Sequence, residues 1–168
     1  MIKYFKILLI IGFGYLFTET KAQESEGKIR ILFIFDGSNS MNAQWEKSSK
    51  ISIAKSLMIQ TMDSLRSLEN IELALRIYGH QSKILPGKQD CSDTKLEVPF
   101  ASANDNYQNI INEIRRLQPK GTTPIARSLE HSAEDFPSCD DCRNIIILIT
   151  DGMEAVSYTH LTLPTNTT

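Results

Sequence analysis

The chain has 168 residues, of which 41% are hydrophobic and 23% are charged, and its formal net charge is −2 at pH 7. These proportions are those of a globular domain with enough apolar residues to build a core. A slightly acidic chain lacks the basic surface of nucleic-acid-binding proteins and of proteins with a polybasic membrane patch, so composition argues against both.

The first residues are typical of a secretory signal peptide. Lys3 and Lys6 give a short basic start, and the apolar stretch that follows is shorter than the roughly 20 residues of a membrane-spanning helix. Thr20-Lys21-Ala22 places small residues before a cleavage site. We expect residues 1–22 to be removed, residues 23–27 to form a short linker, and the protein to be exported to the periplasm, the cell surface or the medium without a stable membrane anchor. The alternative is an uncleaved anchor.

The first element of the mature chain is a strand followed by polar residues. Residues 29–35 are apolar at nearly every position, which is typical of a strand covered on both faces of a parallel sheet. Asp36, Ser38 and Ser40 follow at once. Ligands bind at the carboxyl ends of such strands, and a carboxylate with two hydroxyls suits a hard cation. The alternative is that Asp36 and Ser38 only close a turn or cap a helix.

A long amphipathic helix is predicted next. The residues on its main stripe recur at helical spacing: Ala54, Leu57, Met58, Thr61, Leu65 and Leu68. Met58 and Met62 are expected in the core rather than at a functional site. Trp45, which precedes the helix, is expected either to form part of a binding rim or to pack against the helix start.

Strands and helices continue to alternate along the chain. Residues 71–78 are predicted to form a second strand, and residues 96–100 a short one that Pro99 confines to a sheet edge. His80 is expected in a loop because no second histidine lies at metal-binding spacing. Helical spacing recurs at Ile110, Ile111, Ile114 and Leu117, and again at Ile125, Leu129 and Ala133. This alternation predicts an α/β fold with a parallel or mixed sheet.

Two later segments supply further oxygen atoms near the same sheet edge. Thr122 and Thr123 precede a proline expected at the first position of the last helix, so Thr123 is either a ligand or only the helix cap. Residues 144–150 form a second near-continuous apolar strand, which is followed by Asp151. Together with the loop after the first strand, these segments offer two carboxylates and three hydroxyls to one site.

The three segments resemble the metal-ion-dependent adhesion site of von Willebrand factor type A domains. Asp36-Gly37-Ser38-Asn39-Ser40, Gly121-Thr122-Thr123-Pro124 and Thr150-Asp151-Gly152 have the family's residues in the family's order. The resemblance covers residues 28–155. It implies a Rossmann-like, doubly wound, mostly parallel sheet flanked by helices.

The resemblance also implies a ligand set and a function. Ser38, Ser40 and Thr123 would bind the metal directly, with Thr122 as the alternative to Thr123, and Asp36 and Asp151 would act largely through water. Mg²⁺ suits such a site best because it prefers octahedral oxygen geometry, and Mn²⁺ or Ca²⁺ could replace it. Neutral hydroxyls leave the cation with unbalanced positive charge, so a protein partner would supply an Asp or Glu carboxylate.

The expected function is therefore that of an extracytoplasmic, metal-dependent protein-binding module and not that of an enzyme. One alternative is a structural interaction module with a vestigial metal site. Another is a phosphatase-like hydrolase that depends on a metal, which would need more carboxylate or histidine ligands than these loops supply.

The three cysteines and the last residues complete the prediction. Export permits disulfides, so Cys139 and Cys142 could close a local loop, or one of them could pair with Cys91 or with a cysteine beyond this sequence. A zinc site is the alternative, although closed zinc sites need four ligands. Residues 156–168 resemble a translated sequencing adaptor, so we expect the native domain to be interrupted near Ala155 and its fold to be incomplete at the carboxyl end.

Overall fold

The computed structural model describes residues 27–86 and 89–152; the expected signal peptide and the tail at 156–168 lie outside the described residues. Within them, one mixed sheet has the strand order β5-β4-β1-β6. Its strands are β1 (Lys28–Asp36), β4 (Ile71–Tyr78), β5 (Thr94–Ser102) and β6 (Cys142–Ile149). β1 pairs in parallel with both β4 and β6, whereas β5 runs antiparallel to β4.

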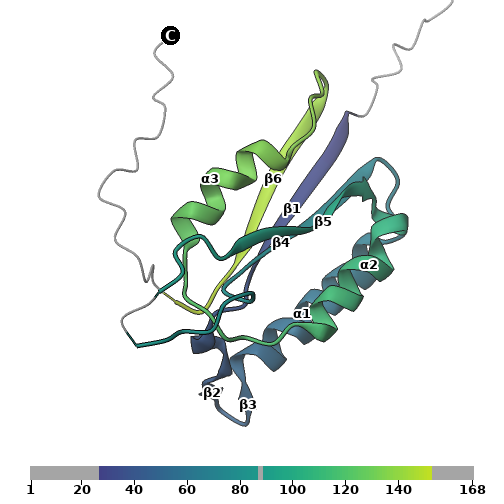
Figure 1. Cartoon of the computed structure of the whole chain (residues 1–168). Helices are drawn as coiled ribbons and strands as arrows, with labels where there is room; N and C mark the ends of the chain where they lie inside the picture. The colour runs from purple at the N-terminus through teal and green to yellow at the C-terminus, as the bar shows by residue number, and fades with distance from the viewer. Residues whose placement is uncertain (1–26, 87–88, 153–168) are drawn as a thin grey trace, which may run out of the picture.

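Helices cover both faces of this sheet (Figure 1). α1 (Lys50–Leu65) and α2 (Ala103–Arg116) pack on one face, and α3 (Ile125–Asp135) packs on the other. A short hairpin of β2 (Gln44–Trp45) and β3 (Ser48–Ser49) precedes α1. The layered arrangement confirms the predicted α/β class. No helix in the described part of the chain is long and apolar enough to cross a membrane.

The central strand β1 is buried because its alternate side chains enter two cores. Phe33 and Phe35 belong to the larger core, beneath α1 and α2, together with Met58 and Met62. The side chains of Leu32 and Ile34 belong to the smaller core on the α3 side. A strand that is covered on both faces needs apolar residues at every position, which explains the unbroken apolar run. The assignment of both methionines to the core is confirmed.

The buried stripe of α1 differs from the predicted one. Ile51, Ala54, Met58 and Met62 face the core. Leu57 is 58% exposed, and Leu68 lies beyond the end of the helix and is also exposed. The stripe therefore begins at Ile51 and passes to one side of Leu57, so the prediction that Leu57 and Leu68 lie on the buried face was wrong.

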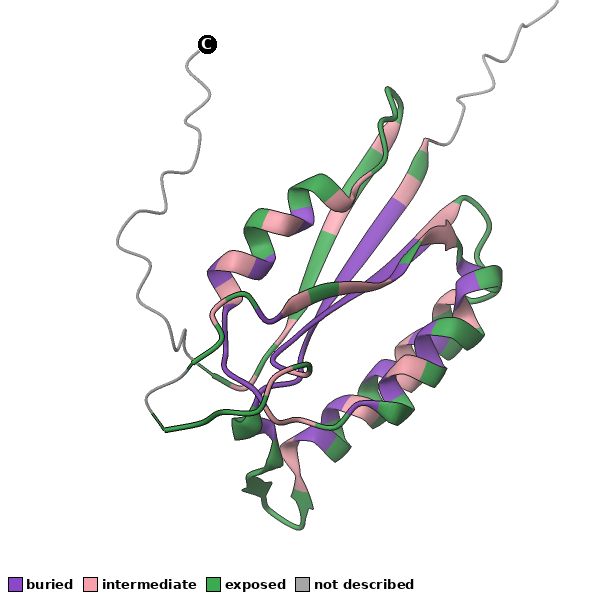
Figure 2. Ribbon diagram, in the orientation of Figure 1, coloured by how far each residue is buried: buried purple, intermediate pink, exposed green. Residues whose placement is uncertain are grey.

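The two edge strands have different surroundings. β5 is an edge strand, as Pro99 predicted, but it has nine residues rather than five. At the other edge, no described strand pairs with the outer side of β6, and Ile146, Ile147 and Leu148 are 37 to 42% exposed. Figure 2 shows this contrast: β1 and β4 are mostly buried, and β6 is mostly exposed.

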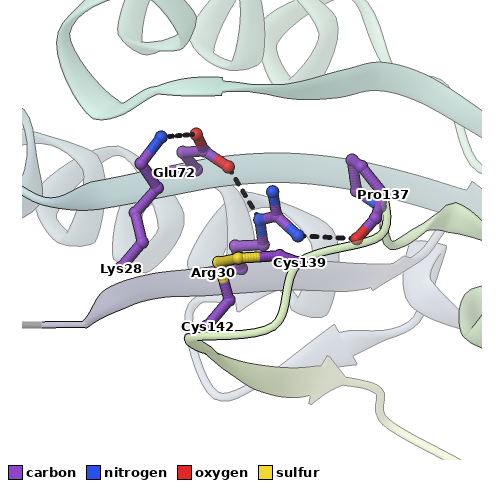
Figure 3. The surroundings of a disulfide bond; sticks show 6 residues. All are labelled: Lys28, Arg30, Glu72, Pro137, Cys139 and Cys142. Carbon is purple, nitrogen blue, oxygen red and sulfur yellow. Dashed lines mark hydrogen bonds and ion pairs between the residues drawn. A yellow bond between two sulfur atoms is a disulfide. The ribbon is translucent and has the colours of Figure 1, made fainter.

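A disulfide and a buried arginine hold the segment between α3 and β6. Cys139 and Cys142 are bonded to each other, which is the local pairing among the expected alternatives, and Cys91 is free. Beside them, the Arg30 guanidinium donates to the carbonyl oxygen of Pro137 at 2.6 Å (Figure 3). The same guanidinium also donates to the carboxylate of Glu72 on β4 at 2.8 Å. The chain is thus fixed where it enters β6.

We expect replacement of both bonded cysteines, Cys139→Ser and Cys142→Ser, to lower the free energy of unfolding by about 2 kcal/mol. The two residues are only three apart, and cross-linking a loop this short removes little entropy from the unfolded chain. Urea unfolding without reductant measures the change. Cys91→Ser is the control, and equal midpoints for the double variant and the wild type would contradict the expectation.

Candidate metal site

The polar residues that follow β1 lie at the carboxyl edge of the sheet. Asp36 ends the strand and is completely buried, and a short 3-10 helix, η2 (Asn39–Asn42), follows it. The backbone N–H of Ser38 donates to Asp36 Oδ1 at 2.8 Å. Asp36 therefore does close a turn, as the alternative interpretation proposed. The turn uses one carboxylate oxygen of Asp36 and directs the chain toward the other loops at this edge of the sheet.

A chain of hydrogen bonds joins the serines to the later aspartate. The hydroxyls of Ser38 and Ser40 are 2.9 Å apart, and Ser40 Oγ donates to Asp151 Oδ1, also at 2.9 Å. A hydroxyl has one proton, so Ser40 accepts from Ser38 and donates to Asp151. Thr150 Oγ1 completes the cluster by donating to Asp36 Oδ2 at 2.8 Å. The structure thus brings four of the predicted residues together: Asp36, Ser38, Ser40 and Asp151.

The threonine segment lies beside this cluster. Ser38 and Gly121 form a parallel bridge, and the backbone N–H of Asn39 donates to the Gly121 carbonyl oxygen at 2.9 Å. The hydroxyl of Thr122 donates to the carbonyl oxygen of Asp90 at 2.5 Å, which directs it toward a different loop. Thr123 is 7% exposed, and its place as the third hydroxyl of the site stays a prediction.

The start of α3 differs by one residue from the prediction. The helix begins at Ile125, so Pro124 occupies the cap position rather than the first helical position. The Pro124 side chain makes no capping hydrogen bond. Both interpretations of Thr123, as a metal ligand and as only a helix cap, therefore stay predictions.

The loop after β4 holds the threonine segment in place. Gly79 has φ +68°, and its carbonyl oxygen accepts the backbone N–H of Gly121 at 2.8 Å. The buried carboxylate of Asp93 accepts the backbone N–H groups of Gln81 and Ser82 at 3.0 and 2.9 Å. Backbone hydrogen bonds therefore join the loop after β1, the loop after β4 and the threonine segment.

The positions of His80 and Trp45 were also predicted. His80 lies in the loop after β4, as expected, and its Nε2 is 2.8 Å from the Glu97 carboxylate. Trp45 is 60% exposed and lines an apolar groove of about 510 Å³ between α1 and β6, together with Leu57 and Ile147. Asp151 and the start of α1 line the same groove, so the role of Trp45 as part of a binding rim stays a prediction.

Sequence reasoning missed three residues of the cluster. Lys50, the first residue of α1, donates from Nζ to Asp151 Oδ2 at 2.6 Å. Thr150 was only part of a motif, yet it bonds to Asp36. Burial raises the pKa of Tyr78 far above its ordinary value, and the negative charge of Asp36 adds to the effect. Only Thr150 carried a signal in the sequence, because it directly precedes Asp151.

The donor set fits a small, hard cation. Two neighbouring corners of an octahedron with bonds of roughly 2.0 to 2.1 Å are about 2.9 Å apart, which matches the separation of the Ser38 and Ser40 oxygens. The Tyr78 hydroxyl is buried beside Asp36 without a hydrogen-bond partner among the described residues, and such a polar group suits a metal-bound water. In the described part of the chain, no three histidine, cysteine or acidic side chains gather to hold a metal.

Comparisons with known proteins add to this geometry. Residues 31–154 match the von Willebrand factor type A domain. The uncharacterized protein YwmD of Bacillus subtilis is 34% identical over 136 residues, which are 79% of this chain but 59% of YwmD, so the chain spans little more than half of that relative.

Two solved structures of bacterial pilus proteins share the fold. The minor pilin PilB of Streptococcus sanguinis has a TM-score of 0.60 and 22% identity over 77% of this chain and 31% of PilB. For the pilus adhesin SpaC of Lactobacillus rhamnosus GG the TM-score is 0.61 and the identity 18%, over 79% of this chain and 16% of SpaC.

Proposed function

Because the chain belongs to the von Willebrand factor type A domain family, we propose that it is an exported protein-binding module that acts through a divalent cation. PilB is a minor pilin and SpaC a pilus adhesin, which is consistent with a role outside the cytoplasm. The hydrogen-bonded chain from Ser38 through Ser40 to Asp151 carries the proposal. It places two hydroxyl oxygens side by side, with a carboxylate that accepts the proton of Ser40.

In this proposal Ser38, Ser40 and Thr123 bind Mg²⁺ directly, and Mn²⁺ or Ca²⁺ can replace it. Asp36 and Asp151 orient the hydroxyls and hold metal-bound water. Because Asp151 accepts the proton of Ser40, a lone pair of that serine oxygen can face the cation. The bound Mg²⁺ supplies a positive centre for an anionic ligand.

The partner is a protein that presents an Asp or Glu side chain. Hydroxyl ligands do not neutralise the cation, so a carboxylate is the natural ligand to complete its coordination. The exposed ring of Trp45 lies at the rim of the groove that reaches Asp151, where it can contact the residues around that carboxylate. A hydrolase is not favoured, since the ligand loops offer two carboxylates and no histidine as base.

Calorimetric titration of Mg²⁺ tests the proposal. We expect the wild type to bind one ion and Ser38→Ala/Ser40→Ala to bind at least about 100-fold more weakly, because loss of outer-shell groups alone costs 10 to 100-fold. The control is Ser56→Ala/Ser64→Ala, which removes two hydroxyls that bond only to backbone carbonyls of α1. Equal binding by both double variants would overturn the assignment of ligands. No binding by the wild type would favour the structural module with a vestigial site.

A further inference from the structure

Lys50 occupies an unusual position for a lysine. It is the first residue of α1, and the first turn of that helix contains no acidic residue. A cation at the amino end of a helix opposes the helix dipole, which favours negative charge there. Its ammonium group is instead held by Asp151, with 2.6 Å between Lys50 Nζ and Asp151 Oδ2. The lysine is thus stabilised by the site rather than by its own helix.

The pairing changes the charge of the cluster. Asp151 is nearly buried, and each of its oxygens accepts a hydrogen bond, one from Ser40 and one from Lys50. With Asp36, the three charged side chains of the cluster sum to a charge of −1. A divalent cation would raise this sum to +1. Without Lys50 the loaded cluster would be neutral, and its attraction for a carboxylate would be weaker.

We propose that Lys50 determines the specificity of the site by weakening the binding of the bare metal and leaving the loaded site positively charged. The loaded site then selects an acidic ligand over a neutral one. This inference rests on the proposed function, because it assumes that the cluster holds a cation. Lys50 contacts only Asp151 among the proposed site residues, so it acts on the charge and orientation of the site rather than as a metal ligand.

The test compares Lys50→Met with the wild type in calorimetric titrations of Mg²⁺ alone. We expect the dissociation constant of Lys50→Met to fall about tenfold, because a positive charge close to the cation is lost. Lys47→Met, which removes an exposed lysine of the neighbouring hairpin, is the control and should stay within about twofold of the wild type. Lys50→Arg, which keeps the charge, should also resemble the wild type.

Two further measurements make the result specific. In EDTA, Lys50→Met should melt at a lower temperature than the wild type, since Asp151 has lost its counter-charge, and Mg²⁺ should raise its Tm by more. In saturating Mg²⁺, acetate followed by NMR should bind Lys50→Met at least about threefold more weakly. Equal or weaker Mg²⁺ binding by Lys50→Met would overturn the role of Lys50 while leaving the metal site in place. No binding by either protein would overturn the metal site itself.

Discussion

Replacing Asp135 with alanine should lower the free energy of unfolding by about 3 to 5 kcal/mol. The Arg76 guanidinium binds the Asp135 carboxylate through two hydrogen bonds of 2.6 and 2.7 Å, and both side chains are only 8% exposed. The pair joins β4 to the end of α3. Removal of one partner leaves the other charge buried without compensation, which is the costly way to break a buried ion pair. Urea unfolding followed by circular dichroism measures the change.

Glu130→Ala is the matched control on the same helix. Glu130 forms an exposed pair with Arg127, at 3.3 Å, and such surface pairs contribute less than about 1 kcal/mol. A second variant, Arg76→Met/Asp135→Leu, removes both charges and should recover most of the stability, because it leaves no unpaired charge. If Asp135→Ala unfolded within about 1 kcal/mol of the wild type, the pair would not hold α3 to the sheet.

The pattern of apolar residues predicted which segments form strands, but it did not predict where each strand lies in the sheet. Residues 29–35 and 144–150 are both near-continuous apolar runs, and both form strands. β1 is central and buried, whereas β6 lies at the edge of the sheet formed by the described residues, with Ile146 and Leu148 exposed. The residues of a strand show how apolar it is, but they do not show which other strands lie beside it in the sheet. The spacing of apolar residues likewise predicted the helix α1. It did not predict that Leu57 is exposed, because that depends on which distant elements pack against the helix.

The part of the candidate site that could be predicted consists of residues that lie close to one another in the sequence or directly after an apolar strand. Asp36, Ser38 and Ser40 are spaced closely at the end of one strand, and Asp151 lies just after a neighbouring strand that runs parallel to it. The role of Lys50 could not be read from the sequence, because its partner is 101 residues away and nothing around it forms a pattern. The buried Tyr78 hydroxyl was missed because it is aligned with Asp36 by the register of β1 and β4, which only the structure gives.

Gly79 links the fold to the site, and we expect Gly79→Ala to lower the free energy of unfolding by about 2 to 5 kcal/mol. Its φ of +68° is costly for any residue with a Cβ, by roughly 1 to 2 kcal/mol. A Cβ would also lie 2.3 Å from the Thr122 carbonyl oxygen and 2.8 Å from Ser38 Cα, and overpacking typically adds about 1 to 3 kcal/mol. Urea unfolding measures the loss.

The same substitution should weaken Mg²⁺ binding, because the clashing atoms belong to the two loops that carry Ser38 and Thr123. Backbone atoms cannot rotate away, so the loops must move apart. Gly152→Ala is the control beside Asp151, since no described atom lies within 4 Å of the position that its Cβ would take. We expect calorimetry to show unchanged Mg²⁺ binding for Gly152→Ala and at least about tenfold weaker binding for Gly79→Ala. The tenfold figure is the lower end of the loss seen when groups that support metal ligands are removed. Lower stability with unchanged Mg²⁺ affinity would mean that the cation does not bridge these two loops.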